Sequence, residues 1–138
     1  MMVRKIPLCH NCPYKPIDFR LGDVNEVNGK KINIFDIDLV IEIGKRIEAI
    51  VEVKRYCNAI AYNTFTVPAH EIIGYKKVAK SLKCDLYLLV FDGYWYYLAE
   101  IDRFSKYDVV NGVVKFPRSM FRVLTESELQ MYFLDRYG

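Results

Sequence analysis

The stretch FDIDLVIEIGKRIEAIVEVK, residues 35–54, decides the fold of this chain. Apolar and polar residues alternate along both of its halves, and alternate side chains of an extended strand share one face of a sheet. The turn Ile43-Gly44-Lys45 separates the two halves. The pattern therefore predicts an antiparallel hairpin, and the pairing register of that hairpin decides which side chains meet.

The far ends of this hairpin hold its reactive residue types. Asp36 and Asp38 share a face of the first strand, and Glu52 and Lys54 share a face of the second. Neighbouring carboxylates repel each other unless a cation lies between them, and a hard divalent ion, most naturally Mg²⁺, removes that conflict. Such an ion polarises a phosphate and orients a water, while a nearby lysine stabilises developing negative charge. These residue types together predict metal-assisted phosphodiester hydrolysis.

Asn-Gly and Asp-Gly pairs mark further tight turns along the chain, because they supply the positive φ angles that two-residue hairpin loops require. They separate residues 17–27 from 30–43, residues 86–91 from 94–101, and residues 107–110 from 113–116. The chain is therefore expected to be built largely from antiparallel hairpins.

Two segments have helical periodicity. The first is Ala69–Lys83. Its apolar face is expected to consist of Ile72, Ile73, Val78, Ala79 and Leu82, with Lys76, Lys77 and Lys80 outside. The second helix follows the capping-box pattern formed by Thr125 and Glu128. A strand ending at Lys54, a helix, and a strand starting near Asp85 form a βαβ unit, whose strands pair in parallel.

Length and composition indicate one globular domain. The 138 residues suffice for a single core, and 52% apolar with 27% charged residues excludes a disordered chain. We expect an α/β fold over residues 1–138, with a mixed central sheet of hairpins, a crossover helix and a C-terminal helix. Residues 1–16 are expected to be irregular, and residues 103–138 to add a hairpin and the last helix.

The remaining bulk properties concern location and partners. No apolar run is long enough to span a bilayer, and the N-terminal residues lack the apolar core of a signal peptide, so we expect a cytoplasmic protein. The net charge of +3 permits nucleic-acid binding without arguing for it. Cys9 and Cys12 have the spacing of half a zinc site, but no second pair follows, and Cys57 and Cys84 are distant. Structural or reduced thiols are therefore favoured over zinc.

The runs FDIDLV (residues 35–40) and IVEVKR (residues 50–55), separated by one turn, resemble the PD-(D/E)xK nuclease superfamily. The resemblance implies a restriction-endonuclease-like fold and a Mg²⁺-dependent or Mn²⁺-dependent deoxyribonuclease. It assigns Asp38 and Glu52 as metal ligands and Lys54 as the catalytic lysine. The proline that usually precedes the first acidic residue is absent here.

Other parts of the resemblance leave alternatives open. Asp36 is the alternative first ligand, because it shares a face with Asp38. The family usually opens with a helix that carries an acidic residue, and here only Glu26, in an expected strand, is a candidate for that role. Glu71 and Tyr75 are similar to the QxxxY helix of RecB-like members, with Glu in place of Gln.

The layout of the helix and the aromatic strand after it is similar to archaeal Holliday junction resolvases. That resemblance implies DNA as the partner, possible specificity for junction-like DNA, a homodimer, and an archaeal or viral origin. The residues expected to contact DNA are Arg55, Tyr75, Lys76 and Lys77. The alternative is a catalytically inactive nucleic-acid-binding or assembly module on the same fold.

Overall fold

The structure is a computed structural model of the chain, and it describes residues 2–5, 26–27, 30–31, 39–43 and 46–137. Its centre is a six-stranded sheet with the strand order β1-β4-β5-β7-β8-β10. The strands are β1 (Met2–Lys5), β4 (Leu39–Ile43), β5 (Arg46–Arg55), β7 (Asp85–Phe91), β8 (Tyr96–Ile101) and β10 (Arg122–Leu124). β5 and β7 are parallel and the other neighbours are antiparallel, so the predicted mixed sheet is confirmed.

The hairpin predicted from residues 35–54 is present in its described part, as β4 and β5, while residues 35–38 and 44–45 lie outside the described residues. Val40 pairs with Ile50, and both side chains lie in the same core cluster. A β-bulge interrupts the ladder, because Ile41 pairs with Ala49 whereas Glu42 pairs with Ile47. The bulge adds one residue to β5, which turns the side chain of Ile47 to the same face as that of Ile50. Apolar side chains therefore fill this face on both sides of the bulge.

The crossover between the parallel strands contains more than a helix. After β5 the chain forms the short 3₁₀ helix η2 (Ala59–Ala61), strand β6 (Thr64–Pro68) and helix α1 (Ala69–Leu82), and then enters β7. Pro68 is the N-cap residue of α1, and Lys83 ends the helix in the left-handed conformation with φ of 55°. The predicted βαβ unit is thereby confirmed.

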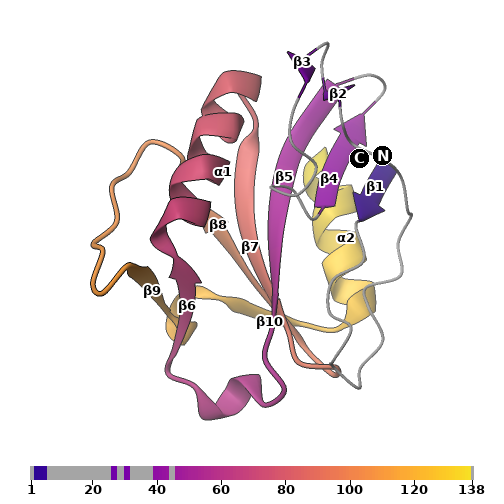
Figure 1. The fold of residues 1–138 in the computed structure, drawn as a ribbon. Coiled ribbons are helices and arrows are strands. Elements are labelled where there is room, and N and C mark those ends of the chain that lie inside the picture. The colour runs from indigo at the N-terminus through magenta and orange to yellow at the C-terminus, as the bar shows by residue number, and fades with distance from the viewer. Residues whose placement is uncertain (1, 6–25, 28–29, 32–38, 44–45, 138) are drawn as a thin grey trace.

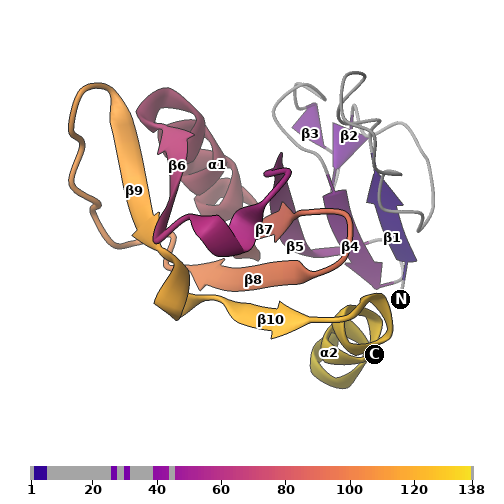
Figure 2. The same cartoon turned by 90° about the horizontal axis from the view of Figure 1, so that it is seen from below.

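The two helices cover opposite faces of the sheet, which Figures 1 and 2 show as three layers. α1 packs on the face formed by Ile50, Leu88 and their neighbours. Helix α2 (Glu126–Tyr137) packs on the other face through Leu129 and Phe133. β7 is buried on both faces, which explains its continuous apolar run.

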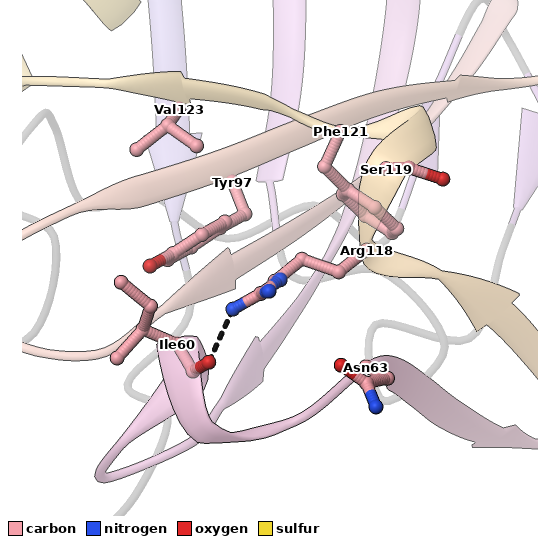
Figure 3. Close-up of a pocket in the computed structure, with 7 residues that line it drawn as sticks. All are labelled: Ile60, Asn63, Tyr97, Arg118, Ser119, Phe121 and Val123. Atoms are coloured by element: carbon pink, nitrogen blue, oxygen red, sulfur yellow. Dashed lines mark hydrogen bonds between the residues drawn. The ribbon is translucent and has the colours of Figure 1, made fainter.

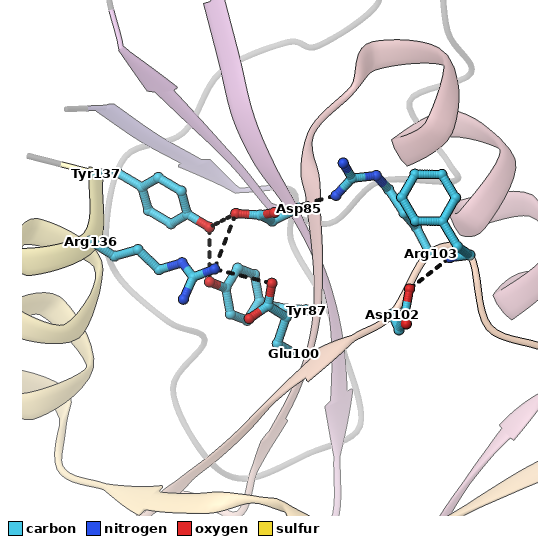
Figure 4. A network of polar contacts seen from close by, with 8 residues as sticks. Asp85, Tyr87, Glu100, Asp102, Arg103, Arg136 and Tyr137 are labelled. Carbon is cyan, nitrogen blue, oxygen red and sulfur yellow. Dashed lines mark hydrogen bonds and ion pairs between the residues drawn. The ribbon is translucent and has the colours of Figure 1, made fainter.

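A polar network fixes the end of α2 (Figure 4). The hydroxyl of Tyr137 donates to Asp85 and lies 2.8 Å from the hydroxyl of Tyr87. Arg136 pairs with Asp85 at 3.6 Å and with Glu100 at 3.2 Å. Burial, together with the hydrogen bond to Asp85, raises the pKa of Tyr137. At the other end of α2, Thr125 and Glu128 form the predicted capping box through reciprocal hydrogen bonds of 3.0 and 3.2 Å.

The hairpin predicted for residues 107–116 is wrong. Asn111 and Gly112 do form a turn, with φ of 52° and 77°, but only the bridge between Val110 and Val113 closes it. Strand β9 (Val113–Pro117) pairs instead with β6, followed by the short 3₁₀ helix η3 (Arg118–Met120). Core burial explains this choice, because Val114 and Phe116 join Phe65 and Val67 in the core, whereas residues 108–110 remain exposed.

Two further expectations need correction. Residues 2–5 form β1, paired with β4, although residues 1–16 were expected to be irregular. On α1, Ile73 is 50% exposed, and Tyr75 occupies the core in its place. β2 (Glu26–Val27) and β3 (Lys30–Lys31) form an antiparallel pair, and the turn predicted at residues 28–29 lies outside the described residues. Among the described residues, no helix has the length and apolarity needed to cross a membrane.

Candidate active site

Three charged side chains meet where the carboxyl end of β5 approaches the first turn of α1. Lys54 Nζ lies 3.2 Å from Glu52 Oε1 and 2.6 Å from Glu71 Oε2. We name Glu52, Lys54 and Glu71 the Lys54 cluster. Strand parity placed Glu52 and Lys54 on one face, and the crossover brings Glu71 onto that face from 17 residues further along the chain.

The local sequence explains why the cluster forms on the α1 face. Glu52 and Lys54 follow Ile50 at intervals of two, so all three share the face that α1 covers. β7 supplies the neighbours, because Glu52 pairs with Leu88 and Lys54 pairs with Val90. Apolar side chains thus surround the polar pair on the strand, and Glu71 is the acidic residue in the first turn of the helix above it.

Glu52 differs from the other buried acidic residue that the structure describes. Glu52 is 4% exposed and Asp92 is 7% exposed. Asp92 has a structural role, because its carboxylate accepts hydrogen bonds from the backbone of Tyr94 and Trp95 in the turn after β7. Glu52 instead meets an ammonium group. Burying a carboxylate is costly without a cation or hydrogen-bond donors, so Lys54 stabilises Glu52 in its charged form.

The charges of the cluster bear on which ion it could hold. Burial lowers the pKa of Lys54, but the hydrogen bond to Glu71 and the charge of Glu52 outweigh it, so the pKa lies above its usual value. Lys54 is therefore an ammonium group. Two carboxylates and one ammonium leave a charge of −1, and their oxygens are the ligand type that Mg²⁺ and Mn²⁺ prefer. Carboxylate oxygens are thus the right ligand type for a hard divalent ion, although the described residues alone do not gather enough of them to hold one.

The other proposed ligands cannot be placed from the structure. Asp36 and Asp38 lie outside the described residues, and Glu26 is in β2 with only its backbone described. Leu39, the residue after Asp38, pairs with Val51, the residue before Glu52. Within the described part of the chain, no group of three or more His, Cys, Asp or Glu residues could hold a metal. The assignments of Asp36, Asp38 and Glu26 therefore stay predictions.

The residues expected to contact DNA occupy different environments. Arg55 is partly exposed, with its guanidinium carbon 5.1 Å from the centre of the Phe91 ring. Lys77 is exposed, and Lys76 donates a hydrogen bond to the carbonyl of Ser105. Tyr75 is only 5% exposed and packs in the core beneath α1. Their contact with DNA stays a prediction.

The cysteines do not converge within the described residues. Cys57 is exposed, whereas Cys84 is buried after the end of α1. Burial raises the pKa of the Cys84 thiol to about 12. Cys9 and Cys12 lie outside the described residues. The structure therefore adds nothing to the zinc alternative.

Sequence reasoning noted Glu71 only as part of a helix pattern and did not place it at the site. Its contact with Lys54 depends on how the crossover packs over β5, which local periodicity cannot give. The available signal was its position in the first turn of the helix that follows the motif strand.

Figure 3 shows a separate cavity of about 520 Å³. Its lining residues Tyr97 and Phe121 belong to the core cluster on the α1 face of the sheet. It is lined by Ile60, Asn63, Tyr97, Arg118, Ser119, Phe121 and Val123. Arg118 donates to the carbonyl of Ile60 across the cavity. The ring of Phe65 packs 5.7 Å from that of Tyr97 and 5.0 Å from that of Tyr56. Phe65 thus stands between the cavity and the end of β5, which makes the cavity distinct from the Lys54 cluster.

Comparison with solved structures finds a Holliday junction resolvase, Hjc, from the archaeal hyperthermophile Archaeoglobus fulgidus. The two chains are 14% identical, and the match covers 68% of this chain and 78% of that chain with a TM-score of 0.47. No protein-family model matches the chain, and no curated protein matches it.

Proposed function

We propose that the chain is a metal-dependent endonuclease that hydrolyses DNA phosphodiester bonds, with the Lys54 cluster in its active site. The observation that supports this most strongly is the position of Lys54, within 3.2 Å of Glu52 and 2.6 Å of Glu71 at the end of a buried strand. A lysine beside a buried carboxylate is the arrangement that the PD-(D/E)xK resemblance requires.

The proposal places Asp38 as the second metal ligand. Leu39, the residue after Asp38, pairs with Val51, the residue before Glu52, and this register supports the assignment. Asp36 is the alternative ligand, and Glu26 is the candidate for the additional acidic residue of the family. A second carboxylate beside Glu52 would raise the negative charge of the site and strengthen its preference for a divalent ion.

The protein groups have separable tasks in this proposal. When bound, Mg²⁺ or Mn²⁺ would polarise the scissile phosphate and lower the pKa of an attacking water. Glu52 and Asp38 would hold that ion. The ammonium of Lys54 would donate hydrogen bonds to the water and to the phosphate oxygens, where negative charge develops in the transition state. Glu71 holds Lys54 in position for that contact.

The proposal extends to the binding mode. Arg55, Lys76 and Lys77 are proposed to contact phosphates, and two copies of the chain to act as a homodimer on the two strands of a junction-like DNA. A zinc ion at Cys9 and Cys12 is not favoured.

The second candidate function is an inactive nucleic-acid-binding module. The same contacts support it, because Lys54 already pairs with both carboxylates and the cluster is stable as an ion-pair network without metal. The two functions differ in their metal requirement. The module binds nucleic acid in a salt-sensitive way without taking up Mg²⁺ or Mn²⁺.

One assay separates the two functions. The protein is incubated with single-stranded, duplex, flapped and four-way DNA, in Mg²⁺, in Mn²⁺ and in a chelator. We expect cleavage only with a divalent ion, and a loss of about 100-fold to 1,000-fold in Glu52→Gln and Asp38→Asn.

The matched control is Glu48→Gln, on the same strand, whose carboxylate pairs with Arg46 at 3.5 Å instead of with Lys54. It should cleave at the wild-type rate. Full activity in Glu52→Gln would refute the assignment, and DNA binding without metal uptake in calorimetry would establish the second function.

A further inference from the structure

On the flank of α1 away from Glu71, a loop holds an exposed aromatic ring among basic side chains. Phe104 is 67% exposed. Arg103 and Lys80 place their cationic groups 4.8 and 5.9 Å from the centre of its ring. One turn earlier on the helix, Lys76 Nζ lies 5.5 Å from the ring centre of Tyr107. We name Lys76, Lys80, Arg103 and Phe104 the Phe104 surface.

Hydrogen bonds within the loop keep Phe104 exposed. The side chain of Asp102 accepts from the backbone of Phe104 at 2.9 Å and from the hydroxyl of Ser105 at 2.8 Å. The carbonyl of Ser105 accepts from Lys76, which ties the loop to α1. The position of Phe104 is therefore preorganised, so binding through its ring would cost little ordering entropy.

Tyr107 anchors the same loop from below. Its hydroxyl accepts from the backbone of Asp102 at 3.2 Å, and its ring packs 5.3 Å from the ring of buried Phe116. Tyr107 thus belongs to the core side of the loop and Phe104 to the solvent side. Of these two rings, Phe104 is the one that a partner can reach.

The charges around Phe104 favour a polyanionic partner. Burial lowers the pKa of Lys76, and the nearby charges of Lys80 and Lys106 lower it further, while the charge of Asp102 acts in the opposite direction. Three lysines therefore gather here. The two acidic residues that contact this surface already have partners. Asp102 caps the loop, and Asp85 pairs with Arg103 at 3.4 Å (Figure 4).

We propose that the Phe104 surface binds single-stranded nucleic acid, with an unpaired base stacked on Phe104 and phosphates at Lys76 and Lys80. Stacking requires a base whose face is exposed, and the bases inside a duplex already have both faces covered. Lys80 is exposed and sits at the outer limit of cation–π range, about 6 Å, so it can leave the ring for a phosphate. The inference goes beyond the proposed function, because it requires neither metal nor cleavage.

The test measures binding in a chelator, so that no cleavage occurs. Fluorescence anisotropy compares a labelled single-stranded oligonucleotide with the blunt duplex of the same sequence. We expect Phe104→Leu to weaken single-strand binding about tenfold and to leave duplex binding within about twofold of wild type. Lys80→Gln should lower the slope of log affinity against log salt by about 0.7.

Matched controls come from the α2 side of the molecule. Arg122→Gln removes a cation that lies 5.5 Å from the ring centre of Tyr132, with the same change in net charge as Lys80→Gln. Met131→Ala removes an exposed apolar side chain, 52% exposed, from α2. Both should bind single strands like wild type, and thermal melting should confirm that every variant is folded.

The competing partner is an acidic peptide, which offers charge without bases. Wild-type affinity in Phe104→Leu, or equal displacement of the oligonucleotide by polyglutamate, would overturn the inference. The outcome does not depend on the proposed function. Phe104-dependent binding in the chelator, together with no cleavage in Mg²⁺ or Mn²⁺, would refute only the nuclease, and cleavage in Mg²⁺ with unchanged binding in Phe104→Leu would refute only this surface.

Discussion

The two flanks of α1 use lysine in opposite ways. On one flank, Lys54 lies between two carboxylates, at 3.2 and 2.6 Å, so its position is fixed and its charge is cancelled locally. On the other flank, Lys76 and Lys80 lie over aromatic rings, which attract an ammonium without neutralising it. The first arrangement suits chemistry at one atom, and the second suits attraction of an extended anion.

The largest expected effect tests whether Lys54 has a chemical task or only a structural one. Lys54→Arg keeps a cation between Glu52 and Glu71, so the free energy of unfolding should stay within about 1 kcal/mol of wild type. The planar guanidinium cannot present its donors where the ammonium does, and single-turnover cleavage should fall about 100-fold.

Lys115→Arg, at an exposed position of β9, is the matched control and should retain full activity. A purely structural Lys54 would tolerate arginine without loss of cleavage. Activity within threefold of wild type would therefore remove the catalytic lysine from the proposal.

A smaller effect is expected at Glu71, which acts through Lys54 and is a positioning residue. Glu71→Gln keeps an acceptor near Lys54 but loses the charge, and a hydrogen bond to a charged group contributes about 1.5–3 kcal/mol. We expect kcat to fall about tenfold while the affinity for uncleaved DNA in a chelator is unchanged.

Glu100→Gln is the matched control, because Glu100 also pairs with a cation, Arg136 at 3.2 Å, but far from the site. If Glu71 were only structural, Glu71→Gln would lower the melting temperature and leave kcat unchanged. That result would contradict the positioning role.

The local sequence pattern predicted the flank of α1 at Lys54 better than the flank that carries Phe104. Strand parity placed Glu52 and Lys54 on one face because side-chain alternation is a property of the strand alone. The contact of Lys54 with Glu71, 17 positions later in the chain, depends on how the crossover folds back, and local pattern contains no such information. The parallel pairing of β5 with β7 was predictable because a helix of sufficient length joins them.

The Phe104 surface was not predicted, and the segment that follows it, residues 107–116, was assigned to a hairpin. Asn111-Gly112 is a strong hairpin signal, and the turn does form, but β9 pairs with β6. Burial decided the partner, since Phe65 of β6 offers Phe116 a place in the core and residues 108–110 do not. Residues 107–110, which do not pair as a strand, continue the loop that begins at Asp102 and presents Phe104.

The smallest expected effect tests whether the two flanks are independent. Glu71 and Lys80 are nine residues apart, about 13.5 Å along the helix, and Glu71 contacts β5 whereas Lys80 contacts the loop. Sites this far apart with no shared partner combine additively within about 0.5 kcal/mol. The double variant Glu71→Gln with Phe104→Leu should therefore show the product of the two single losses in kcat/KM, measured on a flapped oligonucleotide.

In that product, Glu71→Gln should account for the fall in kcat and Phe104→Leu for the rise in KM, because one flank positions the reacting group and the other holds the strand. A coupling energy above about 1 kcal/mol would mean that the base stacked on Phe104 helps to place the scissile phosphate at Lys54. The two flanks would then form one continuous substrate channel around α1. Lys54 would not serve chemistry alone, and Lys76 and Lys80 would not serve binding alone.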